Sequence, residues 1–123
     1  MNYFDDKEFL CKCGRLECDA LTVVSPILLS QLNILRNLYG RPLTINSGLR
    51  CEFWNDKEGG VKDSEHLAGD AADIPCSNGK DRYELVRKAF EAGFERIGVG
   101  KTFVHLDVSP SKVAGVIWLY PSV

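Results

Sequence analysis

Apolar residues recur at helical spacing in the first third of the chain. After Ser25-Pro26 they fall every three or four positions, at Leu28, Leu32, Leu35 and Leu38. A serine before a proline is typical of a helix start, because the serine hydroxyl caps the first turn and proline suits the first helical position. Gly40, followed by Pro42, ends the pattern. We therefore predict a core helix over residues 26–39 that buries its leucine face.

A second amphipathic stretch follows Ser77-Asn78-Gly79 and stops at Gly93. Its apolar positions are Leu85, Val86, Ala89 and Phe90. This spacing predicts a second helix over about residues 80–92, with those four side chains on its buried face.

Short runs rich in β-branched and aromatic residues predict the strands. These runs cover residues 43–46, 71–74, 96–99, 103–108 and 116–120. The segment Gly100-Lys101-Thr102 has the length of a hairpin connection. Residues 1–24 and 51–65 show no such pattern, so we expect irregular structure in both. Two main helices, with four or five strands gathered late in the chain, predict an α+β fold with a small, mostly antiparallel sheet.

Length and composition predict one ordinary domain over residues 1–123. Hydrophobic residues make up 45% of the chain and charged residues 26%, values typical of globular proteins. The net charge of −2 argues against bulk attraction to nucleic acid or to an anionic membrane. No apolar run has the length of a membrane span. The first six residues lack the basic and apolar blocks of a secretory signal.

The cysteine count is odd, which argues against a disulfide framework. The five are Cys11, Cys13, Cys18, Cys51 and Cys76. Reduced structural or free thiols are the first expectation. A second metal site on Cys11, Cys13 and Cys18 is an alternative, although their spacing differs from that of a zinc knuckle. A disulfide is the third possibility.

Both histidines of the chain lie near carboxylates. His66 and Asp73 are seven positions apart in a segment of small residues, and His105 lies within the apolar run 103–108. Two imidazoles and one carboxylate suit an open catalytic zinc site, which keeps its fourth position for water. We therefore hypothesise that His66, Asp73 and His105 bind zinc. A capped surface histidine or a satisfied core histidine is the alternative for His66.

The strand that carries His105 makes the metal hypothesis more specific. Side chains alternate along a strand, so Val104 and Leu106 face one side while His105 and Asp107 face the other. Two such polar residues on one sheet face are unusual for a strand that only packs a core.

These motifs resemble the signature of a known family. The matching segments are Ile45-Asn46-Ser47-Gly48-Leu49-Arg50-Cys51, Asn55, Gly59-Gly60-Val61, Ser64-x-His66-x-x-Gly69-x-Ala71-x-Asp73 and Phe103-Val104-His105-Leu106-Asp107-Val108. In order and spacing they are similar to the zinc D-Ala-D-Ala carboxypeptidases and phage L-alanyl-D-glutamate endopeptidases of the M15 peptidase group. That group shares its fold with the Hedgehog signalling domain. The resemblance runs from about residue 4 to about residue 110.

The resemblance implies a Hedgehog/DD-peptidase-like fold, a Zn²⁺ cofactor on the three ligands, and roles for two more residues. Arg50 would hold the polarised carbonyl or a substrate carboxylate, for which a guanidinium is suited. The alternative is a buried arginine paired with an acid. Ser64 would donate a hydrogen bond to substrate, or else cap its own turn. Iron, manganese or nickel could occupy the same ligands in a preparation.

The general base is the least defined part of the predicted site. Several branches of the family carry a carboxylate a few residues before the last histidine, whereas residues 99–104 contain none. Asp107 is the first candidate because it shares a strand face with His105. Its alternative role is to orient a histidine ligand through the other ring nitrogen. Glu95 is the second candidate.

Together these features predict a zinc metallopeptidase that hydrolyses peptide bonds in bacterial peptidoglycan stem peptides, as a carboxypeptidase or an endopeptidase. We expect a monomeric phage or prophage lysin, made in the bacterial cytoplasm and acting on the cell wall. An inactive zinc-containing binding module of the same fold is the alternative. A nucleic-acid-binding zinc protein built on the cysteines is disfavoured by the acidic balance.

Four aromatic residues complete the predictions. We expect Phe53 and Trp54 to line the cleft or to anchor their loop in the core. We expect Trp118 and Tyr120 to take part in ordinary sheet packing.

Overall fold

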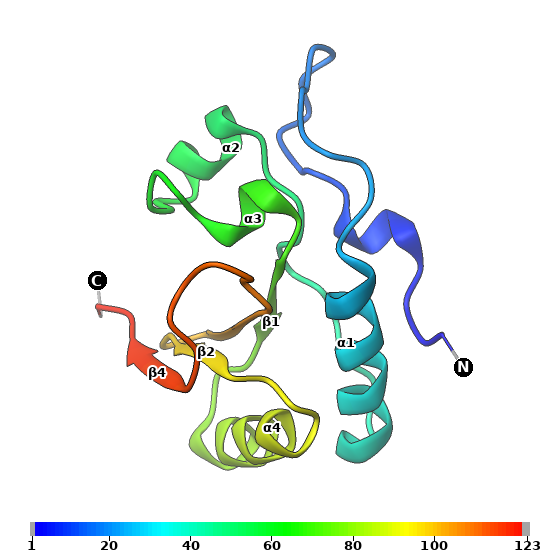
Figure 1. Ribbon diagram of the computed structural model, residues 1–123, viewed down its shortest axis with the longest axis vertical. Helices are drawn as coiled ribbons and strands as arrows, with labels where there is room; N and C mark the ends of the chain where they lie inside the picture. The colour runs from blue at the N-terminus through cyan, green and yellow to red at the C-terminus, as the bar shows by residue number, and fades with distance from the viewer. Residues whose placement is uncertain (1, 122–123) are drawn as a thin grey trace.

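The computed structural model describes residues 2–121. Its elements in chain order are η1 (Asp6–Phe9), α1 (Pro26–Tyr39), α2 (Glu52–Lys57), α3 (Glu65–Ala68), β1 (Ala71–Pro75), α4 (Gly79–Glu91), β2 (Arg96–Val99), β3 (Phe103–Asp107) and β4 (Val116–Leu119). Figure 1 shows α4 below the strands, α1 beside them, and α2 and α3 above them.

The four strands form one mixed sheet in the order β1-β3-β2-β4. β3 pairs antiparallel with both β1 and β2, whereas β4 lies parallel to β2. The observed fold therefore confirms the α+β class, and two of its three strand pairings are antiparallel.

The two faces of the sheet have opposite character. Val104 and Leu106 of β3 are fully buried and belong to the hydrophobic core, together with Ala72, Ile74 and Ile97 from the neighbouring strands. The core also contains the leucine face of α1 and the buried residues of α4. The alternate positions of β1 and β3 carry Asp73, His105 and Asp107. Alternation thus places the polar row on the face away from α1 and α4.

Helix α1 has the bounds that its sequence pattern predicts. The Ser25 hydroxyl accepts hydrogen bonds from the backbone of Ile27 and Leu28 at its start. At its end Gly40 takes a left-handed conformation with φ of 75°, which glycine adopts at little cost. Three of the four predicted leucines are buried, whereas Leu38 is exposed.

Helix α4 is close to the predicted second helix. Its buried residues are Leu85 and Ala89, as expected. Phe90 is more than half exposed, so its predicted burial is wrong. Five residues beyond Leu85 correspond to about 500° of helical rotation, which turns Phe90 away from the buried face.

The strand predicted over residues 43–46 does not form. Only one isolated bridge joins Ser47 to Asp73. Its backbone bonds run from Asn46 to Asp73 and from Asp73 to Ser47. The chain then leaves the sheet, because the backbone N–H of Leu49 donates to the carbonyl of Phe9. This departure limits the pairing to a single bridge and creates the turn that carries Arg50.

The long loop predicted over residues 51–65 contains two short helices instead. The sulfur of Cys51 caps α2 by accepting a hydrogen bond from the backbone of Trp54, and a cysteine is not a usual N-cap signal. Helix α3 is one turn long, too short to produce a periodic pattern. The predicted irregular segment 1–24 likewise includes one 3₁₀ turn, η1, closed by a capping box of Asp5 and Glu8.

No helix among the described residues combines the length and apolar character that crossing a membrane requires.

We predict that Ser25→Ala lowers the free energy of unfolding by about 1 kcal/mol, because it removes the acceptor for two backbone donors of α1. Ser30→Ala is the matched control, since Ser30 is exposed within the same helix, where alanine is well tolerated. Urea unfolding of both variants measures the difference. Equal destabilisation by the two changes would contradict the capping role.

Candidate metal centre

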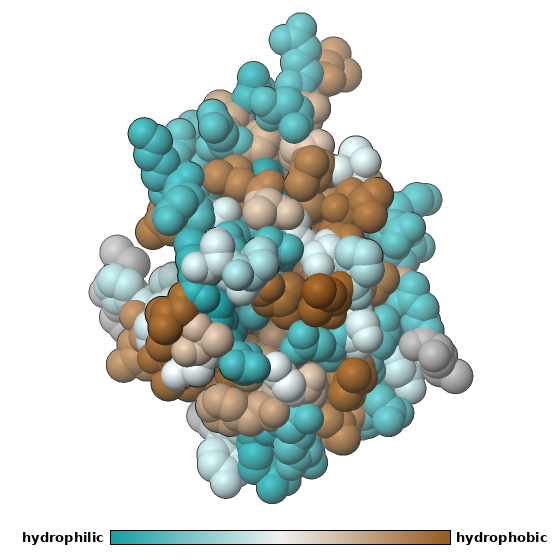
Figure 2. All heavy atoms as spheres, in the orientation of Figure 1, coloured by the Kyte–Doolittle hydropathy of each residue, from teal (hydrophilic) through white to brown (hydrophobic). Residues whose placement is uncertain are grey.

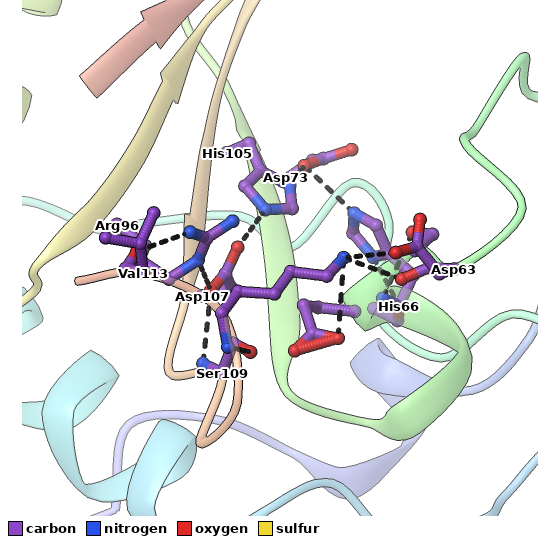
Figure 3. A network of polar contacts seen from close by, with 12 residues as sticks. Asp63, His66, Asp73, Arg96, His105, Asp107, Ser109 and Val113 are labelled. Carbon is purple, nitrogen blue, oxygen red and sulfur yellow. Dashed lines mark hydrogen bonds and ion pairs between the residues drawn. The ribbon is translucent and has the colours of Figure 1, made fainter. Parts of the chain in front are cut away.

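His66, Asp73 and His105 meet at one end of the polar sheet face. Asp73 of β1 lies directly opposite His105 of β3 in the strand register, and His66 comes from α3. One ligand atom from each residue lies within 4.8 Å of the other two. Figure 3 shows Asp73 between the two imidazole rings, with Asp107 beyond His105. The structure therefore brings the three predicted metal ligands together.

The backbone fixes the tautomer of His66. Its Nδ1 lies 2.7 Å from the carbonyl oxygen of Gly48. A carbonyl can only accept, so Nδ1 carries the proton and donates it. Nε2 is then left with a free electron pair, 3.2 Å from Oδ1 of Asp73. The cap of α3 supports this placement, because the Ser64 hydroxyl accepts from the backbone N–H of His66 at 3.2 Å.

A carboxylate fixes the tautomer of His105. Nε2 lies 2.7 Å from Oδ2 of Asp107. The other oxygen of Asp107 accepts from Nε of Arg96 at 2.7 Å and from the backbone of Ser109 at 3.1 Å. Burial alone would raise the pKa of Asp107, but these contacts hold its pKa below the ordinary value. Asp107 is therefore an ionised acceptor, and the Nδ1 electron pair of His105 faces Oδ1 of Asp73 at 3.0 Å.

Nε2 of His66, Nδ1 of His105 and Oδ1 of Asp73 thus converge, while one proton of each ring lies on its opposite nitrogen. Two imidazole nitrogens and one carboxylate oxygen repel one another unless a proton or a cation lies among them. Donor separations of 3.0 and 3.2 Å are close to the edge of about 3.3–3.4 Å in a tetrahedron with zinc bonds of about 2.0–2.1 Å. The donor set therefore fits Zn²⁺.

Arg50 forms an ion pair with Asp73, one of the three candidate metal ligands. Its Nη2 lies 3.0 Å from Oδ2 of Asp73. Nε donates to the Ser47 hydroxyl at 2.9 Å, and Nη1 donates to the side-chain oxygen of Asn55 at 3.2 Å. A Cβ at position 60 would lie 2.1 Å from that same oxygen, so Gly60 is needed for this arrangement. The buried ion pair matches the alternative expected for Arg50, and its contact with substrate stays a prediction.

The centre opens onto a cavity of about 650 Å³. The lining residues include Arg50, Ser64, His66, Asp73, His105 and Asp107, but not Phe53, Trp54 or Glu95. Phe53 is instead covered by the guanidinium of Arg15, 4.4 Å from the ring centre. The cap made by Ser64 matches its alternative role, and its hydroxyl hydrogen stays available to donate into the cavity.

Trp118 and Tyr120 form an aromatic wall of this cavity, which the sequence reasoning missed. Their ring centres lie 5.5 and 6.3 Å from that of His105. Gly98 lies between His105 and Trp118 in the register of the sheet. A Cβ there would lie 2.6 Å from the indole nitrogen, so glycine lets the indole approach the imidazole. Alternation along residues 116–120 was the available signal. Ile117 and Leu119 are exposed, so Trp118 and Tyr120 face the other side of the strand, toward the cavity.

The two candidates for the general base differ in position. Asp107 contacts the ring nitrogen of His105 that points away from Asp73, and both of its oxygens are engaged. This geometry suits the orienting role, the alternative expected for Asp107. Glu95 is exposed and lies outside the cavity lining. Catalysis by either residue stays a prediction.

Comparison with known proteins gives one family. The family model described as Peptidase M15 matches residues 2–107, a range that includes all three candidate ligands. The comparison with curated proteins found no match.

We predict that Asp107→Asn weakens zinc binding by about 10- to 100-fold, because it removes the anion that fixes the tautomer of His105. Competition against a chelator of known affinity measures the change. Asp81→Asn is the control, since Asp81 lies in the first turn of α4 and outside the cavity lining. Unchanged zinc affinity in the Asp107 variant would contradict the orienting role.

Zinc binding is expected to weaken as the pH falls. Burial would lower the pKa of His105, but its bonds with Asp107 and Asp73 raise that pKa above the ordinary value of a histidine in the metal-free protein. Below this pKa zinc must displace a proton, so its affinity drops by about tenfold per pH unit for one proton. Above it the competition disappears. Chelator competition across this range tests the effect, and a constant affinity would contradict it.

Proposed function

Because the chain belongs to the M15 peptidase family, we propose that it is a zinc peptidase that cleaves peptide bonds in peptidoglycan stem peptides. The observation that carries this proposal is the convergence of ligand atoms from His66, Asp73 and His105 beside a cavity. Three protein ligands with adjacent open space are typical of a catalytic zinc site, whereas structural sites are closed by four ligands.

His66, Asp73 and His105 would hold the Zn²⁺. The bound ion would supply Lewis acidity toward a peptide carbonyl and toward water. The surrounding residues would orient the three ligands. Gly48 and Asp107 fix the two imidazole tautomers, and Arg50 occupies the second oxygen of Asp73. That oxygen is then directed to the guanidinium, which leaves Oδ1 for the metal.

The cavity offers groups that suit a short peptide. Trp118 and Tyr120 provide an apolar wall next to His105. Burial raises the pKa of Tyr120, so its phenol keeps its proton and can donate a hydrogen bond. Ser64 adds a second hydroxyl to the lining. Such donors suit the carbonyl and carboxylate groups of a stem peptide.

The bond that is cleaved defines the type of peptidase. We propose either carboxypeptidase action, which releases a terminal D-alanine, or endopeptidase action between L-alanine and D-glutamate. Resemblance to the phage enzymes supports a lysin that is made in a bacterial cytoplasm and acts on the cell wall. Mass spectrometry of the released products separates the two activities.

An inactive zinc-containing module of the same fold is the second candidate. The position of Asp107 favours it, because a carboxylate bound to Arg96 and His105 has no free oxygen for a proton from water. In that case the cavity would bind wall peptides without cleaving them.

We expect the purified protein to release new amino groups or free D-alanine from peptidoglycan, and a chelator to stop this release. His66→Ala should reduce the release to background, because it removes one of three metal ligands. Asp81→Asn, in the first turn of α4 and outside the cavity lining, should retain full activity. Absence of chelator-sensitive release from every wall type tested would favour the inactive module.

The role of Asp107 can be separated from metal binding by adding saturating zinc. If Asp107 only orients His105, Asp107→Asn should recover a kcat within about tenfold of the original chain once zinc is restored. If Asp107 is the general base, kcat should stay about 10²- to 10⁴-fold lower despite full metal occupancy. Zinc content and kcat are measured on the same samples.

A further inference from the structure

We propose that Cys11, Cys13, Cys18 and Cys51 bind a second Zn²⁺ in a closed, four-thiolate site that is separate from the His66 centre. Three of these cysteines lie in the N-terminal segment, and the fourth is the N-cap of α2. The sequence pattern alone pointed to the first three, and the fold adds Cys51.

The four sulfur atoms have the spacing of a zinc site. All lie within 4.8 Å of one another. The Sγ atoms of Cys11 and Cys51 are 3.8 Å apart. A tetrahedral zinc with sulfur bonds of about 2.3 Å has sulfur–sulfur edges of about 3.8 Å. The cluster therefore has room for one zinc ion at ordinary bond lengths.

Backbone donors point at the sulfurs. The N–H of Cys51 donates to Sγ of Cys11, that of Trp54 to Sγ of Cys51, and that of Arg15 to Sγ of Cys13, each at 3.4 Å. Hydrogen bonds that a sulfur accepts favour its ionised form over the thiol. Metal binding requires that form. These backbone N–H groups would therefore stabilise the thiolates that bind the metal.

Disulfide bonding explains the cluster less well. All five cysteines of the chain are free thiols in the structure. A disulfide joins only one pair of sulfurs, so one or two disulfides would not require all four sulfurs to lie within 4.8 Å of one another. A single zinc ion uses all four.

The N-terminal segment needs a cross-link of this kind. None of residues 10–23, all of which the structure describes, is buried. Leu16, Leu21 and Val23 are exposed, so the segment has little apolar burial to hold it in place. Figure 1 shows it projecting beside α2, and Figure 2 shows hydrophilic side chains among apolar ones over the same end. A metal site supplies the missing folding free energy directly.

The proposed site also supports the turn next to the catalytic centre. Cys51 directly follows Arg50, and Lys12, between two of the cysteines, donates to the carbonyls of Ile45 and Asn46 at 3.3 and 2.8 Å. Zinc on the four sulfurs would therefore fix both ends of the segment that carries Ser47, Gly48 and Arg50.

Zinc analysis of the purified chain tests this proposal. Protein produced with zinc under reducing conditions should contain two zinc ions per chain. Cys13→Ser and Cys18→Ser should each lower the content to one, and His66→Ala should also lower it to one. Cys76→Ser is the matched control, because Cys76 is a buried cysteine outside the cluster, and it should keep two.

Spectroscopy of the original chain avoids reliance on variants that fail to fold. Cobalt substitution should give the intense sulfur-to-metal charge-transfer band of a four-thiolate site, and the band should persist in His66→Ala. Zinc-edge X-ray absorption should show sulfur neighbours at about 2.3 Å.

Two results would overturn the proposal: one zinc per chain that is lost only in His66→Ala, or a disulfide among the four cysteines in zinc-replete protein. Either result would leave the peptidase proposal intact. Conversely, two zinc ions without chelator-sensitive hydrolysis would support the thiolate site and contradict the peptidase function.

Discussion

The structure of the candidate centre depends on one carboxylate, Asp73, which faces two imidazole electron pairs with one oxygen and a guanidinium with the other. Gly48 and Asp107 each hold one proton on the outer nitrogen of a histidine. The inner side of the cluster is left with negative charge and lone pairs. A buried arrangement of this kind is unfavourable unless a proton or a cation lies among the donors, and a divalent metal ion meets that requirement.

The sheet makes this arrangement possible by separating its two faces. Val104 and Leu106 bury themselves among the helices, and the intervening residue His105 must then point the other way. Antiparallel pairing with β1 places Asp73 directly opposite. A slip of one residue in either strand would turn a metal ligand into the core and a core residue into the cavity. The apolar packing on one face therefore fixes the register of the polar chemistry on the other.

Features that depend on local sequence patterns could be predicted, whereas contacts between residues far apart in the sequence could not. The three candidate ligands could be chosen from the sequence because alternation along 103–108 and the short motif 64–73 are local patterns, and the structure places these residues together. Trp118 reaches the site only through the parallel pairing of β4 with β2 across Gly98, and no local pattern reveals that contact. The ion pair of Arg96 with Asp107 likewise depends on the register between the neighbouring strands β2 and β3. Cys51 joins three cysteines about 40 residues earlier, a contact that depends on how η1 docks against the turn at Leu49.

The two clusters of this chain differ in the feature that separates structural from catalytic metal sites. The cysteine cluster presents four ligands of one kind, which would complete a tetrahedron and leave no position for substrate. The histidine cluster presents three ligands beside a cavity. Arg50 and Cys51 are adjacent, and each contributes to one cluster. With both proposed metals bound, the turn that joins Arg50 to Cys51 would have one end next to a closed site and the other next to an open one. This division suits chemistry at the histidines and rigidity at the cysteines.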